Sequence, residues 1–116
     1  MGRFLVQSQF KQIITAGSQV YDVTSNTTLF VNSVYFVNTT SAAITLTLPQ
    51  LALAGEFVDI FDVAGKFGTN NCIVLPSGDG STVGGFADNL TLNLDRVNIR
   101  LQFSSGLNNW VVTQLI

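Results

Sequence analysis

Histidine is absent from this 116-residue sequence, and cysteine occurs once. The lack of histidine removes the side chain that most often acts as a general base near neutral pH and most often binds transition metals. Cys72, the single cysteine, has no partner in the chain for a disulfide and no second thiolate for a zinc site. We therefore expect no catalytic residue, no metal site and no cofactor, and we predict that Cys72 is a small buried apolar residue.

Charge is also scarce: charged residues make up 10% of the chain, whereas hydrophobic residues make up 47%. Globular domains usually carry roughly 25% charged residues. The five lysines and arginines are scattered singly and the net charge is −2, so we expect no nucleic-acid binding. No apolar run approaches the ~18 residues that span a bilayer, and the apolar patch near the start is too short for a secretory signal peptide, so we expect no membrane insertion.

A surface with so few charges must be built from Ser, Thr, Asn and Gln, or much of it must not face water. The second possibility favours an oligomer, because obligate interfaces resemble a hydrophobic core cut in half. The length fits one domain that can bury a core of its own. Composition therefore predicts one small domain that associates with further copies of itself.

Short runs of β-branched and aromatic residues, separated by turn residues about every 8–12 positions, fill the sequence from Ser18 onward. This pattern predicts an all-β fold, either an antiparallel β-sandwich or a jelly-roll-like barrel. We expect residues 18–116 to form a single β-domain. Residues 1–17 are expected to be an N-terminal arm that attaches to another protein, or a first strand.

Strand positions follow from the apolar periodicity. Strict alternation predicts inward-facing Ile44, Leu46 and Leu48 in one strand and a row of Leu90, Leu92 and Leu94 in a second. It also predicts inward-facing Val97, Ile99, Leu101 and Phe103 in a third. Residues 50–55 are expected to form one helical turn, and residues 25–28 a turn. The expected strands are residues 19–23, 29–37, 43–48, 56–63, 72–75, 89–94, 96–103 and 110–116.

The stretch EFVDIFDV, residues 56–63, has apolar side chains at both alternating sets of positions, as expected for a strand buried on both faces. One set contains two phenylalanines with Asp59 between them. A lone carboxylate in such a place costs several kcal/mol unless it is paired or hydrogen-bonded. We therefore predict that Asp59 forms a buried ion pair with Arg96 or Arg100, or accepts hydrogen bonds from backbone N–H groups.

Two further sets of residues are candidate sites. Trp110, preceded by Asn108 and Asn109, would offer a weak glycan-contact site with a ring for stacking; the alternative is that the ring packs in the core at the start of the last strand. Glu56 and Asp62 share a strand face, but six residues of extended chain separate them by ~20 Å. A glycosidase pair needs ~5–9.5 Å. Cross-strand carboxylates such as Asp88 and Asp95 could still approach either residue, but no hydrolase motif is present, so we expect no enzyme.

Five segments follow one another between Val34 and Val112, over about two thirds of the chain: YFVNTTSAAITLTLP, AGEFVDIFDVAGKFGTNN, STVGG, LTLNLDRVNIRLQF and NNWVV. They place in order a strand that ends in TLTLP, a G-x-x-V-x-I-x-D strand, an asparagine corner, a G-G-F turn and a terminal tryptophan strand. This order resembles a module common in bacteriophage virion proteins, especially tail fibres and related appendages.

The resemblance implies a β-rich, commonly trimeric module with a structural or adhesive role. It implies a non-enzymatic homotrimer, a short-fibre or appendage module that contacts its own copies and another virion protein. Such a protein would be found in the virion after assembly in the bacterial host cytoplasm. A capsid decoration (cement) protein that stabilises the head is one alternative. A carbohydrate-binding module that contacts a host-surface glycan is an alternative of another class.

Overall fold

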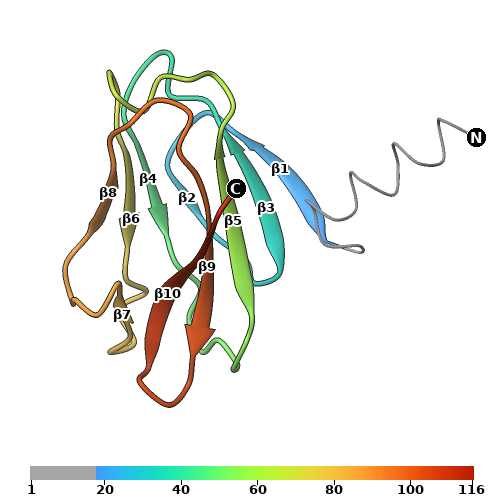
Figure 1. The fold of residues 1–116 in the computed structure, drawn as a ribbon, viewed down its shortest axis with the longest axis vertical. Coiled ribbons are helices and arrows are strands. Elements are labelled where there is room, and N and C mark those ends of the chain that lie inside the picture. Colours follow the sequence, from blue (N-terminus) through green and yellow to red (C-terminus); the bar gives the residue numbers. More distant parts are fainter. Residues whose placement is uncertain (1–17) are drawn as a thin grey trace, which may run out of the picture.

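A computed structural model describes residues 18–116, in which two β-sheets face each other (Figure 1). The six-stranded sheet has the order β1-β3-β5-β9-β10-β7, and the four-stranded sheet has the order β2-β4-β6-β8. Two sheets confirm the all-β prediction and are compatible with a sandwich. The predicted N-terminal arm lies outside the described residues. The strands are β1 (Gln19–Val23), β2 (Thr27–Thr28), β3 (Ser33–Val37), β4 (Ile44–Thr47), β5 (Phe57–Asp62), β6 (Cys72–Leu75), β7 (Thr82–Val83), β8 (Leu90–Leu92), β9 (Asn98–Ser104) and β10 (Asn109–Leu115).

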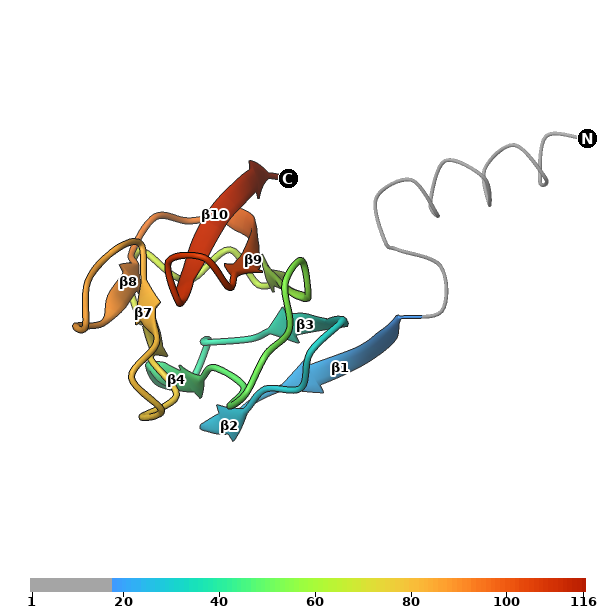
Figure 2. The same cartoon turned by 90° about the horizontal axis from the view of Figure 1, so that it is seen from below.

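The chain crosses from one sheet to the other at every connection from β1 to β9. The first of these connections, from β1 through β2 and β3 to β4, can be followed in Figure 2. Strands that follow each other within one sheet therefore run parallel: β1 with β3, β3 with β5, β2 with β4, and β4 with β6. The later strands reverse direction, because β9 is antiparallel to β5 and β10, and β8 is antiparallel to β6.

The sheets are thus mixed, whereas the sequence predicted antiparallel pairing throughout. Alternation of apolar and polar residues does not distinguish the two, because neighbouring side chains point to the same face in both kinds of ladder. The parallel pairs arise because, from β1 to β6, the chain passes through the other sheet between two strands of the same sheet. It therefore re-enters each sheet in the same direction. No helix within residues 18–116 is long and apolar enough to cross a membrane.

The hydrophobic core fills the space between the sheets. Alternation correctly predicted the contributions of β4 and β9, and Cys72 is buried, as its single occurrence predicted. Val58 and Ile60 point into it from β5, so the phenylalanines of that strand lie on the opposite face. The buried cluster consists of Val23, Leu29, Tyr35, Val37, Ile44, Leu46, Leu48, Val58, Ile60, Phe67, Cys72, Val74, Val83, Leu92, Ile99, Leu101, Phe103 and Trp110.

Two predictions in the first third of the chain were wrong. Residues 29–37 are not one strand, because Asn32 has a φ of 58° and the chain crosses between the sheets there. The Asn32 side chain stabilises this corner by accepting a hydrogen bond from the backbone N–H of Phe57 at 3.3 Å. Thr27 and Thr28, expected in a turn, form the short strand β2 beside β4.

Residues 50–55 do not form the expected helical turn. Leu51 has a φ of 55°, which is incompatible with a right-handed helix, and carboxylates bind the backbone instead. Asp79 accepts a hydrogen bond from the N–H of Leu51 at 2.9 Å, and Glu56 accepts one from the N–H of Leu53 at 2.6 Å. Leu94, expected in a buried row, is 68% exposed because β8 ends at Leu92.

Candidate binding face of the six-stranded sheet

The outer face of the six-stranded sheet combines apolar and polar side chains, which alternate with those that enter the core. Val34 and Asp59 are fully buried on this face, whereas Val20 and Val111 are exposed. Phe36 and Phe61 meet edge to face, with ring centroids 5.6 Å apart. We define the outer face as Val20, Asp22, Val34, Phe36, Phe57, Asp59, Phe61, Asn98, Arg100, Gln102, Ser104, Val111, Thr113 and Gln114.

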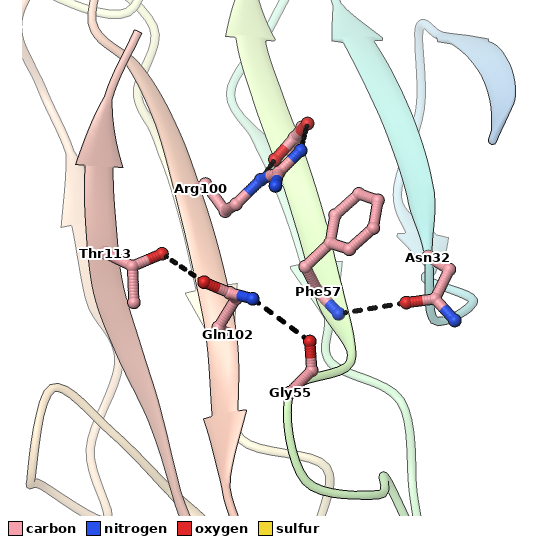
Figure 3. A network of polar contacts seen from close by, with 7 residues as sticks. Asn32, Gly55, Phe57, Arg100, Gln102 and Thr113 are labelled. Atoms are coloured by element: carbon pink, nitrogen blue, oxygen red, sulfur yellow. Dashed lines mark hydrogen bonds and ion pairs between the residues drawn. The ribbon is translucent and has the colours of Figure 1, made fainter. Parts of the chain in front are cut away.

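An ion pair between Asp59 and Arg100 stands at the centre of this face. The Arg100 guanidinium donates from Nε to one carboxylate oxygen of Asp59 at 2.7 Å and from Nη2 to the other at 2.9 Å (Figure 3). Asp59 is fully buried and the Arg100 side chain is 16% exposed. The guanidinium also lies 4.0 Å from the ring centre of Phe57, a cation–π contact. The hydrogen bonds to Asp59 raise the pKa of Arg100.

Of the two arginines predicted as partners of Asp59, Arg100 forms the ion pair. Arg100 lies directly opposite Asp59 in the antiparallel ladder of β5 and β9, so its side chain emerges on the same face. Arg96 precedes β9, and its guanidinium donates to the backbone carbonyl of Val63 at 3.2 Å. The sequence could name both candidates, but only the register of the two strands separates them.

A line of hydrogen bonds crosses the outer face beside the ion pair (Figure 3). The Thr113 hydroxyl on β10 donates to the Gln102 amide oxygen on β9 at 2.9 Å. The Gln102 amide nitrogen in turn donates to the backbone carbonyl of Gly55 at 3.1 Å. These bonds tie three neighbouring segments of the face together.

The three predicted glycan-contact residues adjoin one another, but they do not form a stacking platform. Trp110 is fully buried and packs edge to face on Phe103, with ring centroids 5.4 Å apart. Asn109 accepts hydrogen bonds from the Thr82 hydroxyl at 2.7 Å and from a backbone N–H of the glycine turn at 2.9 Å. Asn108 lies in the exposed hairpin at a φ of 50°. The Trp110 ring therefore packs in the core, as the alternative to a glycan-contact site predicted.

Asp62 organises a loop, whereas the sequence suggested only a carboxylate pair with Glu56. It is 2% exposed and accepts backbone hydrogen bonds from Lys66 and Phe67, both at 3.1 Å, and from Arg96 at 2.9 Å. Gly65 lies within this loop at a φ of 68°. An aspartate at the end of a strand, shortly before a glycine, is typical of such a loop, and this pattern could have identified the role.

No protein-family model matches the chain, and no curated protein matches it significantly. Function must therefore be argued from the side chains and their geometry. Glu56 and Asp62 are both engaged by backbone N–H groups, and they flank opposite ends of β5. Within residues 18–116, no group of three or more His, Cys, Asp or Glu side chains is placed to hold a metal ion.

An open groove of about 550 Å³ lies where β2 and β4 end. Its lining combines apolar side chains such as Leu29 and Pro49 with the hydroxyls and amide of Thr28, Thr47 and Gln50. None of the lining residues carries an ionisable side chain. The groove could offer hydrogen bonds and apolar contact to a ligand, but it holds no group that exchanges a proton near neutral pH.

Cys72 is expected to be unreactive in the folded protein. Burial, with a smaller contribution from the negative charge of Asp62, raises the pKa of its thiol from about 9 to about 12. Because the thiolate is the reactive form, its fraction at pH 8 falls about a thousandfold. A chromogenic disulfide reagent at pH 8 should label Cys72 rapidly in urea and barely at all without it. Equal labelling rates would show that the thiol is accessible.

Proposed function

We propose that this chain is a non-enzymatic structural module of a bacteriophage virion, a homotrimeric short-fibre or appendage protein mounted on the particle. The observation that carries the proposal is the apolar surface that the six-stranded sheet leaves exposed at β1 and β10, where Val20, Val111, Val112 and Leu115 are 43%, 36%, 41% and 79% exposed. Such a surface suits contact with another protein better than contact with water. The resemblance of residues 34–112 to phage appendage modules supports the virion and the threefold symmetry.

Association would supply stability that a small domain has difficulty providing alone. Covering apolar surface contributes ~25 cal/mol per Å² before the costs of association are subtracted. Val20, at 43% exposure, and Val111, at 36% exposure, are the most exposed apolar members of the outer face. Under this proposal the contact with a second virion protein belongs to residues 1–17, as the sequence predicted.

The mass of the purified protein in solution tests the homotrimer. Light scattering behind a sizing column should give about three times 12.5 kDa, because the exposed apolar surface favours association. The same measurement in high salt should give the same mass, since apolar contacts are not screened. A mass of one chain at micromolar concentration would contradict the homotrimer.

Antibody labelling of particles tests the position. Label on the tail or on an appendage is the expected result. Label spread over the head would support the decoration alternative instead, and its absence from particles would reject a virion role. A glycan array provides the matched test of the carbohydrate-binding alternative, for which no binding is expected because the Trp110 ring is buried.

A further inference from the structure

Two strands of the six-stranded sheet have an edge that no described strand pairs with. β1 pairs with β3 on one side only. β7 pairs with β10 only at Asn109 and Trp110, so nothing in residues 18–116 pairs with β10 on that side from Val111 to Leu115. Each edge therefore presents a row of backbone N–H and C=O groups whose natural partner is another extended strand.

The two free edges lie at the same level of the sheet. Register partners run across it from Val20 through Val34, Asp59 and Arg100 to Gln114. The edges also run in the same direction, because β1, β3 and β5 are parallel and two antiparallel steps lead from β5 to β10. A rotation about an axis along the strands preserves both the level and the direction.

Neither free edge carries lysine or proline, although the register of β10 shifts between Val112 and Gln114. Exposed edges normally carry lysine, proline or a very short strand. β1 reads QVYDV with Asp22 as its only charge, and residues 111–115 read VVTQL with none. Val20, Val112 and Leu115 are 43%, 41% and 79% exposed. By contrast, the edge strands of the four-stranded sheet, β2 and β8, have only two and three residues.

We propose that β1 of one copy pairs in parallel with Val111–Leu115 of the next copy, so that the six-stranded sheets join head to tail around a closed ring. A head-to-tail contact between unlike surfaces closes when the rotation returns to the first copy. Each copy then fills both of its free edges, with Val20 opposite Gln114 and Gln19 opposite Val112 of the neighbouring copy. This inference rests on the proposed homotrimer and specifies its contact.

Engineered cysteines test the contact. Within one chain, Val20 and Gln114 lie four strand spacings apart, or ~19 Å, whereas a disulfide needs Cα atoms within ~7 Å. Both positions are exposed, so the substitutions should not disturb the core. After mild oxidation, Val20→Cys/Gln114→Cys should run as a covalent trimer on a non-reducing gel. Each single variant should run as one chain on this gel. An equimolar mixture of the two single variants should give covalent dimers.

The outcomes distinguish a failure of the edge contact from a failure of the proposed homotrimer. Disulfides in either single variant would mean that like edges meet, and would overturn the head-to-tail arrangement. A trimeric mass without disulfides, in this pair and in Gln19→Cys/Val112→Cys one register row away, would overturn the edge contact and leave the homotrimer standing. A monomeric mass would overturn both.

A charge placed on a free edge provides a second, independent readout. Val112→Lys should reduce the mass from three chains to one, because a buried ammonium would oppose the contact. Leu107→Lys is the matched control: Leu107 is 76% exposed, but it lies in the β9–β10 hairpin away from both edges, and its variant should remain trimeric. A trimeric Val112→Lys protein would contradict the proposed contact.

Discussion

Replacing Arg100 with methionine is expected to lower the free energy of unfolding by about 3–5 kcal/mol, because it leaves a buried carboxylate without its cation. Asp59 is fully buried, and both of its oxygens receive hydrogen bonds from the guanidinium. Methionine keeps an apolar chain against the Phe57 ring, so the loss reports on charge more than on packing. Urea denaturation at one fixed protein concentration measures it, since association also contributes to stability.

Substitutions of Asp59 complete this test. Asp59→Ala should destabilise the protein by roughly 3 kcal/mol, whereas Asp59→Leu fills a similar volume and should be tolerated more easily. The double variant Asp59→Leu/Arg100→Met removes both charges and should recover most of the stability lost in Arg100→Met. A change below about 1 kcal/mol in Arg100→Met would contradict a buried pair and would indicate that water reaches Asp59.

Sequence patterns predicted those parts of the fold that depend on residue alternation. β9 has the clean alternation of Ile99, Leu101 and Phe103, and all three are buried. Alternation does not encode which strand lies alongside, so the parallel pairs of the coiling chain were missed. The break at Asn32 was missed for a related reason: apolar residues continue on both sides while the chain changes sheets, so hydrophobicity alone does not mark the corner.

The central feature of the candidate face was predictable in part. Asp59 is a charged residue in an apolar strand, and physical cost alone required a partner for it. The choice of Arg100 depended on strand register, which a single sequence does not contain. Asp62 was harder to interpret, because its partners are backbone N–H groups and every residue of a loop offers one.

Removing the Asp62 carboxylate should destabilise the protein about as much as breaking the ion pair between Asp59 and Arg100. Asp62→Ala is expected to destabilise the protein by about 3 kcal/mol or more, since three backbone N–H groups lose a charged acceptor in a place that water reaches poorly. The loss should extend over two segments, because Asp62 joins the loop at Lys66–Phe67 to the turn that precedes β9. Thermal unfolding gives the magnitude, and amide hydrogen exchange at Phe67 and Arg96 gives the location.

Asp95 provides the matched control for Asp62. Its carboxylate accepts one hydrogen bond, from the backbone N–H of Gly68 at 2.8 Å, at an exposed position close to the same loop. Asp95→Ala should therefore cost only ~1 kcal/mol. Asp62→Asn, which keeps one acceptor oxygen, should fall between the two alanine variants. Equal losses in Asp62→Ala and Asp95→Ala would mean that burial and the number of bonds do not decide the effect, and that another part of the loop holds its shape.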